Sequence, residues 1–303
     1  MANPFDFEFA GASVVGQDHM SRNGVLIGKP NQDAMCDVHL FPEHRVFVVC
    51  DGCGSGTFSE VGSRIGARMT CLTISEMLVG RGYDIGDWPL GRDGVQRMSS
   101  FMDRIRGSIA GRIETQAKAM SDWRDSSSYL TTLGEYFSFT ILGVIMAGRM
   151  AVTFNIGDGY FVVNGDVSQR EAGDDNAPPY IIYDLIPDAH LKDPRGVRLR
   201  NQMVFECYDL KSIDSIIVAT DGMRDILSKE GVEYPGRTDK AIPPPSGFLK
   251  DEFFINPSRL QRELSMMNTE RMLLTDDGNL QRHPGLLSDD TTMYVIRKKT
   301  KKE

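Results

Sequence analysis

The sequence predicts an α+β fold in which helices cover layers of β-strands. Three observations support this class. The apolar runs are short and rich in β-branched and aromatic residues, other segments carry apolar residues at helical spacing, and strand-like runs occur both before and after those helical segments. The 303 residues, 41% of them hydrophobic and 25% charged, are enough for a substantial core. We expect one domain that spans residues 1–303.

The first elements are a strand and a helix joined by glycines. The run HRVFVVCDG, residues 44–52, predicts a strand buried on both faces, because apolar residues follow one another without alternation. Thr57 and Glu60 have the spacing of a capping box, which predicts that a helix begins there. The apolar stripe predicted for this helix consists of Val61, Ile65, Met69 and Leu72.

A second helix and a group of strands follow. The helix is predicted from apolar residues three and four positions apart, namely Val95, Met98, Met102, Ile105, Ile109 and Ile113. Residues 136–171 then alternate strand-like runs with turn residues, and Asn164-Gly165 is a strong hairpin signal. We expect an antiparallel meander in this region.

The last third of the chain mixes loops with further elements. Residues 173–201 are polar and contain proline, so we expect an exposed flap there. The run SIDSIIVATDG predicts another strand, and the density of Pro and Gly within residues 229–257 predicts a surface insertion. Leu260, Leu264 and Met267 predict a late helix, TTMYVIRK predicts the final strand, and residues 297–303 form a basic tail that we expect to be solvated.

The charge balance excludes some classes of partner. A formal net charge of -8 argues against a nucleic-acid-binding face, since phosphate backbones are held by clustered Lys and Arg. The acidic start MANPFDFEFAG does not resemble a signal peptide, and apolar runs such as TILGVIMAG are too short to cross a bilayer. We therefore expect a cytoplasmic monomer with no membrane partner. Five cysteines, an odd and sparse count, indicate reduced thiols rather than disulfides.

The stretch VFVVCDGCGSG allows three interpretations: a redox pair, a phosphate-binding turn or a metal site. A Cys-x-x-Cys zinc site needs a second cysteine pair, which the chain does not offer at ligand spacing. Cys50 falls inside the predicted strand, which favours a buried side chain over a redox thiol. The dinucleotide fingerprint fails because Thr57 stands where its third glycine is required. The five histidines share no close pairing in the sequence, and we keep only His19 as a candidate for proton transfer.

Acidic residues recur where predicted strands end. Asp51, Asp158 and Asp221 each end an apolar run and precede a glycine, and Asp289 and Asp290 come just before the last strand. A single Asp-Gly is usually a turn, but packed strands bring their ends together. Converged carboxylates repel unless cations lie between them, and oxygen ligands alone favour Mg²⁺ or Mn²⁺ over Zn²⁺. The pattern therefore predicts a divalent metal site.

The order of these motifs resembles the PP2C (PPM) family of metal-dependent serine/threonine phosphatases. The matching pieces are NQDA, VVCDGCGSG, FNIGDGYF, VATDGMRDIL and SDDTT, and they span about residues 11–297. The helix segment VGSRIGARM resembles the bacterial subgroup. The resemblance implies a four-layer αββα sandwich, in which two central antiparallel β-sheets are flanked by helices.

The resemblance also implies roles for individual residues. Asp51 would bridge two metal ions, with the Gly52 carbonyl as a further ligand of one of them, and Asp221 and Asp289 would complete the other metal. Asp33 would act close to the metals. Two further assignments follow: Asp158 with Asp225 resembles the acidic set that holds a third, weaker metal in some members, and Thr140 corresponds to a structural threonine.

Three positions depart from the family pattern. Gln32 stands where many members have a metal-binding Glu, although Gln is familiar here in bacterial relatives. Cys53 replaces a histidine that has been assigned as general acid in eukaryotic members. Gly28 occupies the place of the expected phosphate-binding Arg, for which Lys29 or Arg22 could substitute.

The function implied is hydrolysis of phosphoserine or phosphothreonine on a protein, by a water held between two Mn²⁺ or Mg²⁺ ions. The substrate would come from a cognate serine/threonine kinase. Two alternatives stay open at this point. The three departures are compatible with a regulatory or scaffolding module that has lost catalysis, and the loops 173–201 and 229–257 could select a small phosphorylated metabolite instead of a protein.

Overall fold

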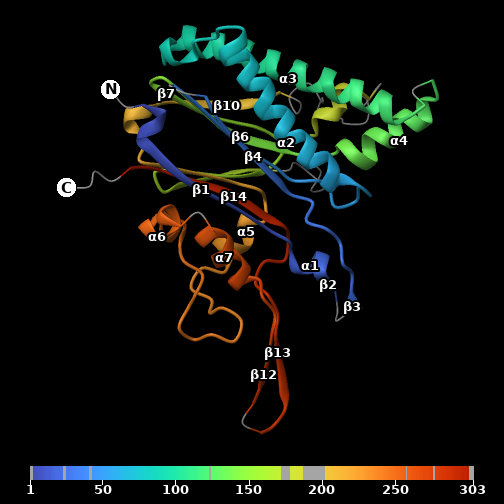
Figure 1. The fold of residues 1–303 in the computed structure, drawn as a ribbon, viewed down its shortest axis with the longest axis vertical. Coiled ribbons are helices and arrows are strands. Elements are labelled where there is room, and N and C mark those ends of the chain that lie inside the picture. The colour runs from blue at the N-terminus through green and yellow to red at the C-terminus, as the bar shows by residue number, and fades with distance from the viewer. Residues whose placement is uncertain are drawn as a thin grey trace.

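Two five-stranded antiparallel sheets packed face to face form the centre of the molecule, with helices on both outer faces (Figure 1). The structure, a computed structural model, describes residues 3–22, 25–40, 43–122, 124–171, 178–186, 202–256, 258–275 and 277–299. The arrangement confirms the predicted α+β class and the four-layer sandwich.

The two sheets have different strand orders. In spatial order, the first consists of β1 (Phe7–Val14), β14 (Thr291–Lys298), β11 (Ser215–Ala219), β8 (Gly159–Val163) and β9 (Asp166–Arg170). The second consists of β10 (Val204–Asp209), β7 (Met150–Ile156), β6 (Ile141–Ala147), β5 (His44–Cys50) and β4 (Ala34–Leu40). β1 and β4 are therefore edge strands.

Helices cover the outer face of each sheet (Figure 1). Over the second sheet lie α2 (Ser59–Ser75), α3 (Arg92–Met120) and α4 (Ser126–Phe137). Against the first lie α5 (Met223–Ser228), α6 (Asp251–Ile255) and α7 (Ser258–Met267). Shorter elements are α1 (Gln17–Met20), the hairpin of β2 (Ser21–Arg22) and β3 (Val25–Leu26), and single helical turns at Pro4–Asp6, Glu76–Gly80, Ile85–Asp87, Ile181–Asp184, Leu210–Ser212 and Pro245–Leu249.

Three apolar clusters hold the four layers together. One fills the space between the sheets and includes Phe47, Leu142 and Tyr294. The second joins α2, α3 and α4 to the second sheet, and the third joins the C-terminal helices to the first sheet. Because burial of apolar area is the main stabilising term in folding, these clusters fix how the sheet ends meet.

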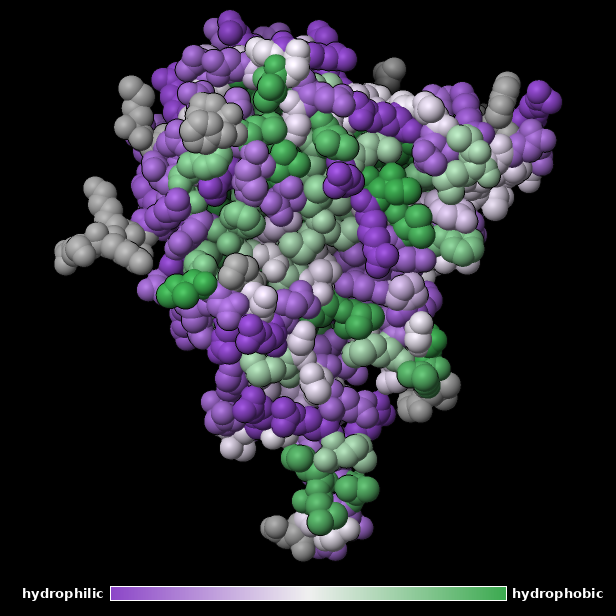
Figure 2. Space-filling model, viewed as in Figure 1, coloured by the Kyte–Doolittle hydropathy of each residue, from purple (hydrophilic) through white to green (hydrophobic). Residues whose placement is uncertain are grey.

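The hairpin of β12 (Arg271–Leu274) and β13 (Leu280–His283) projects away from the sandwich (Figure 1). Apolar side chains show on it in Figure 2, and Leu274 and Leu280 are about 70% exposed. No helix among the described residues is long and apolar enough to cross a membrane.

Most of the predicted elements are present. The strand before Asp51 is β5 and is buried, TTMYVIRK is β14, and Asn164-Gly165 forms the tight turn between β8 and β9 with both residues at positive φ. The second predicted helix is α3, and its apolar positions are buried except Val95. The late helix is α7, whose three predicted apolar residues are fully buried.

The face of α2 that packs on the sheet was predicted wrongly. Val61 and Leu72 of the expected stripe are 38% and 41% exposed, while small residues of the other face are buried. A Cβ at Gly62 would lie 1.5 Å from the carbonyl oxygen of Tyr136, so only glycine allows this close approach. The capping box is also absent, since the N-cap residue is Phe58 and it makes no side-chain cap hydrogen bond.

The predicted meander is split between the two sheets. β6 and β7 pair in the second sheet, but β8 pairs with β11 in the first. The chain therefore crosses from one sheet to the other at residues 157–158. The sequence does not reveal this crossing, because strand-like runs alternate with turn residues in the same way before and after residues 157–158.

The described parts of the two loop regions are more buried than expected. Of the expected flap 173–201, only residues 178–186 lie within the described part, and Tyr180, Ile181 and Ile182 there are at most 9% exposed. The expectation of an exposed segment is wrong for these three residues. The insertion is likewise packed rather than superficial, since its side chains Tyr234, Ile242, Phe248 and Phe253 join the core beside α7.

The basic tail also differs where it is described. Arg297 is 12% exposed and forms ion pairs with Glu8 and Asp251 as part of β14. Residues 300–303 lie outside the described residues.

Candidate active site

An acidic cavity of about 240 Å³ lies where the two sheets end. Four of the predicted site residues line it, namely Asp51, Asp158, Asp221 and Asp289. The rest of the cavity wall consists of His19, Gln32, Gly52, Cys53, Gly54, Pro178 and Tyr180. The structure therefore brings together acids that are up to 238 positions apart in sequence, from Asp51 to Asp289.

Each acid is positioned by the end of a strand. Asp51 directly follows β5, and Asp221 comes two residues after β11. Asp289 comes two residues before β14, and Asp158 lies where the chain crosses from β7 to β8. Both sheets contribute, so the cavity forms only when the two sheets pack together.

Thr140 holds the backbone of Asp51. The amide of Asp51 donates to Thr140 Oγ1 over 3.2 Å, and the amide of Thr140 donates to the Asp51 carbonyl over 2.8 Å. These two contacts are compatible with the structural role expected for Thr140. They fix the direction in which Asp51 leaves β5.

Asp33 is buried next to this cavity. Thr220 Oγ1 donates a hydrogen bond to its Oδ2 over 2.7 Å, which links the second sheet to the first. Thr220 in turn accepts from the amide of Thr292 over 3.0 Å. Asp33 is 4% exposed and does not line the acidic cavity itself.

The acids raise one another's pKa. The pKa of Asp51 is far above its usual value, first because the side chain is buried and then because Asp33, Asp221 and Asp289 are close. Burial, followed by Asp289 and Asp158, raises the pKa of Asp221 to about 7. Burial is also the largest cause of the raised pKa at the other three acids. Without a counter-ion, the fold therefore disfavours the ionised forms.

The residues present fit hard divalent cations. Asp33 Oδ1, Asp158 Oδ1 and Gln32 Oε1 are buried oxygens without a hydrogen-bond partner in the described part of the chain. Buried acceptors that lack a donor are destabilising, and a cation would satisfy them. Among the described residues, no three His, Cys, Asp or Glu side chains form a tight cluster of the kind that holds a metal directly. Mg²⁺ commonly keeps several waters and binds one or two carboxylates, which suits this wider arrangement.

Gly52 and Gln32 form the floor of the cavity. The amide of Gly52 donates to the Gln32 carbonyl over 3.1 Å, and a Cβ at position 52 would lie 2.7 Å from that same oxygen. The Gln32 amide nitrogen faces Ser59 and the loop carbonyls of Cys53 and Gly56. Gln32 is thus anchored through its nitrogen while its oxygen stays without a donor.

Three other predicted residues have different positions. The Lys29 ammonium donates to the Gly54 carbonyl over 2.8 Å, which places a cation at the wall of the cavity. Asp225 is turned elsewhere, since Lys229 Nζ donates to one of its oxygens over 2.8 Å and the Ser288 amide donates to the other. The side chain of Arg22 lies outside what the structure describes.

Asp290 was not predicted as a separate site residue, although it is the most connected acid here. Its Oδ1 accepts from the Gly16 amide and its Oδ2 from the Gln32 amide, both over 2.6 Å. His19 Nδ1 lies 3.0 Å from Asp290 Oδ1, and this contact is the largest cause of the raised pKa of His19. The adjacent pair of acids in SDDTT gave no sign of which one is buried.

Two further residues were missed. Arg224 of the short helix α5 lies 3.6 Å from Asp221 Oδ2, three positions after Asp221 in the sequence. Its spacing from Asp221 could have indicated this pairing. Tyr180 covers the cavity from the segment that was expected to be exposed, and burial raises its pKa. Nothing in the sequence indicates that Tyr180 reaches the site.

Comparison with known proteins identifies a family. A sequence profile described as protein phosphatase 2C matches residues 16–240. No curated protein sequence matches the chain as a relative.

Solved structures provide a second comparison. The crystal structure of a bacterial serine phosphatase has a TM-score of 0.51 at 15% identity, over 98% of this chain and 99% of that chain. The Stp1 serine/threonine phosphatase from Staphylococcus aureus has a TM-score of 0.48 at 13% identity, over 99% of this chain and 98% of that one. The catalytic domain of the phosphatase PstP, in complex with two manganese ions, has a TM-score of 0.47 at 12% identity, over 96% and 97%. Of these three, only the bacterial serine phosphatase has a TM-score above 0.5, and it shows that the two proteins share a fold.

Proposed function

The chain belongs to the protein phosphatase 2C family, and on this premise we propose that it is a metal-dependent protein serine/threonine phosphatase. The observation that supports this function best is the cavity lined by Asp51, Asp158, Asp221 and Asp289. Acids that raise one another's pKa in a buried cavity are typical of functional sites. The substrate would be a phosphoserine or phosphothreonine in a protein, produced by a protein kinase.

We assign Asp51, Asp221 and Asp289 to binding two Mn²⁺ or Mg²⁺ ions, with Asp158 and the Gly52 carbonyl beside them. Bound divalent ions would supply two things: neutralisation of the charge on the phosphoryl oxygens and activation of water. Asp33 stays close to these acids because Thr220 holds it, and Thr140 fixes the backbone of Asp51. We leave Asp225 out of this set, because Lys229 and Ser288 occupy its oxygens.

Lys29 is our candidate for the phosphate contact that Gly28 does not provide. Its ammonium carries three donors, of which the Gly54 carbonyl takes one. The remaining two can face an anion at the cavity wall. As an exposed, mobile point charge, Lys29 would bind phosphate less rigidly than an arginine, whose planar fork makes two parallel hydrogen bonds.

His19 is our candidate for holding the proton of the leaving group. The residue lines the cavity, and its Nδ1 faces Asp290, so Nε2 is the ring nitrogen left for the substrate. Asp290 raises the pKa of His19, which favours the protonated ring. His19 would give its Nε2 proton to the serine or threonine oxygen as the P–O bond breaks.

The test is hydrolysis of a phosphothreonine peptide and of p-nitrophenyl phosphate, with Mn²⁺ and with EDTA. We expect turnover with Mn²⁺, none with EDTA, and a loss of nearly all turnover in Asp51→Asn and Asp221→Asn. Asp103→Asn, on the exposed face of α3, is the matched control and should keep wild-type turnover. Normal activity in both site variants would discard these assignments.

A non-catalytic module would behave differently in the same experiment. It would show no turnover under any metal condition, and calorimetric titration with Mn²⁺ would show weak binding or none. The departures from the family pattern at Gln32 and Cys53 support this non-catalytic alternative. Tight Mn²⁺ binding together with turnover excludes it.

A further inference from the structure

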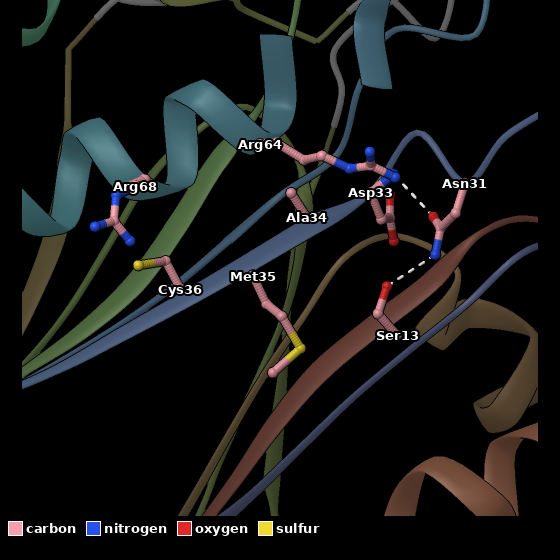
Figure 3. Close-up of a pocket in the computed structure, with 8 residues that line it drawn as sticks. All are labelled: Ser13, Asn31, Asp33, Ala34, Met35, Cys36, Arg64 and Arg68. Atoms are coloured by element: carbon pink, nitrogen blue, oxygen red, sulfur yellow. Dashed lines mark hydrogen bonds between the residues drawn. The ribbon is translucent and has the colours of Figure 1, made fainter. Parts of the chain in front are cut away.

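A second cavity, of about 350 Å³, opens on the side of the sandwich where β1 and β4 are the edge strands. Ser13 of β1, Cys36 of β4 and Asn31, just before β4, line one side, and Arg64 and Arg68 line the other side from α2 (Figure 3). Both guanidinium groups point into this space, one toward Asn31 and the other toward Cys36 (Figure 3). We call it the basic cavity.

Among the described residues, the two arginines have no anionic partner. In the part of the chain that is described, no carboxylate lies within ion-pair distance of Arg64 or Arg68. Other arginines of this acidic protein, such as Arg106, Arg112 and Arg297, do form ion pairs. Like charges one helical turn apart destabilise a helix by about 0.2–0.5 kcal/mol. Repulsion between the two arginines therefore slightly destabilises α2, and an external anion bound between them would reduce this repulsion.

The charge of Arg68 reaches the Cys36 thiol in the cavity wall and lowers its pKa, although the contact with Cys71 lowers it more and burial and Asp37 raise it. Asp33, the one acid in the cavity wall, is buried and bonded to Thr220, so it does not neutralise the arginines. An anion that enters the basic cavity would thus meet two uncompensated cations.

The basic cavity and the acidic cavity share one wall. Asn31 and Asp33 line the basic cavity, while Gln32 between them lines the acidic one, as side chains of an extended segment alternate in direction. A single extended segment therefore separates the two sites. An extended peptide covers on the order of 10 Å in about three residues, which is the reach that we assign to one bound chain across this wall.

We propose that the basic cavity is a second anion-binding site, in which Arg64 and Arg68 bind an acidic group of the same substrate chain, about three residues from the phosphorylated residue. The group is either a carboxylate or a second phosphoryl group, both of which suit the bidentate geometry of arginine. The proposal rests on the proposed phosphatase function. It assigns a preference for acidic phosphoprotein sequences to residues that lie outside the metal site.

The experiment compares peptides that differ in one flanking residue. A phosphothreonine peptide with alanine on both sides is the reference, and each member of the series carries one aspartate between four residues before and four after the phosphothreonine. A parallel series carries phosphoserine instead of aspartate, which distinguishes a carboxylate from a phosphoryl ligand. We expect one position to raise kcat/KM by about tenfold over the reference, as one added charge-assisted contact would do.

The variant Arg64→Gln/Arg68→Gln should bring the ratio between acidic and alanine peptides to about one. Arg97→Gln/Arg104→Gln, two exposed arginines of α3, is the control and should keep the wild-type ratio. Raising the salt concentration should shrink the ratio in wild type, because exposed charges are screened. A ratio that persists in Arg64→Gln/Arg68→Gln, or no preference in wild type at any position, would overturn the proposal.

A binding measurement separates this result from the proposed function. Fluorescence anisotropy of a labelled aspartate-bearing phosphothreonine peptide is measured in EDTA, where no hydrolysis occurs. Binding that is lost in Arg64→Gln/Arg68→Gln supports the basic cavity even if wild type never turns over, in which case only the phosphatase function fails. Equal binding by both proteins refutes the basic cavity even if the enzyme is active.

Discussion

Asp221→Asn tests whether the acidic cavity is a source of instability in the metal-free protein. The pKa of Asp221 rises from 3.8 to about 7, so the folded state holds its proton more strongly than the unfolded chain does. That rise is about three units, and each unit corresponds to about 1.4 kcal/mol. The ionised carboxylate therefore destabilises the metal-free fold by about 4 kcal/mol at pH 8.

The sign of the pH dependence follows from the raised pKa. Below the unfolded pKa both states are protonated, and the contribution of Asp221 to stability is fully present. Between the two pKa values, the unfolded carboxyl is ionised and the folded one is not, so stability falls by about 1.4 kcal/mol for each unit of rising pH. Asn carries no charge, so Asp221→Asn escapes this loss. Its stability relative to wild type should be about 3 kcal/mol greater at pH 8 than at pH 5.

The assay is urea unfolding in EDTA at both pH values, with Asp103→Asn as the exposed control. Excess Mn²⁺ should reverse the order at pH 8, because bound ions stabilise only a fold that keeps the full ligand set. The reasoning is refuted if Asp221→Asn is less stable than wild type in EDTA at pH 8. It is also refuted if the difference between the two proteins does not change with pH.

Three further predictions concern neighbouring residues. His19→Asn should lower kcat by about 100-fold on phosphothreonine peptides and far less on p-nitrophenyl phosphate, whose leaving group needs no proton; equal losses on both substrates would reject the proton-donor role. Gly62→Ala should destabilise the fold by roughly 3 kcal/mol or more, because its Cβ would lie 1.5 Å from the Tyr136 carbonyl oxygen, and thermal unfolding checks this. Asp290→Asn should destabilise by about 1–3 kcal/mol, since an amide offers one oxygen where the carboxylate accepts from two backbone amides; an unchanged urea midpoint would contradict it.

The sequence was sufficient for the parts of the fold that follow from local periodicity. The buried strand before Asp51, the helix through Ile105 and the final strand were all predicted from spacing alone, because their apolar residues face a core on the expected side. The acids at the strand ends were found in the same way. Asp51, Asp158 and Asp221 share the Asp-Gly pattern, and the structure gathers them in one cavity.

The failures have a common physical cause, which is that packing partners are not visible in the sequence. The stripe of α2 was misassigned because this helix packs through small residues, such as Gly62 against the backbone of α4, where hydrophobicity gives no signal. The buried position of Tyr180 was missed because residues 173–201 were interpreted as one polar flap, although Ile181 and Ile182 follow Tyr180 directly and are buried with it. In SDDTT the two acids are chemically identical, and only the amides of Gly16 and Gln32 distinguish Asp290 from Asp289.

The division of the site between two sheets explains why the departures from the family pattern need not remove the site. Asp33 and Asp51 come from the second sheet, while Asp221 and Asp289 come from the first, and the cluster around Phe47 holds the sheets together. The positions of these acids therefore depend on the core between the sheets and on contacts such as that between Thr220 and Asp33, not on residue 28 or 53. On the proposed function, substitutions at those two positions would change which groups meet the phosphate and the leaving oxygen, while the acids that would hold the metals stay in place.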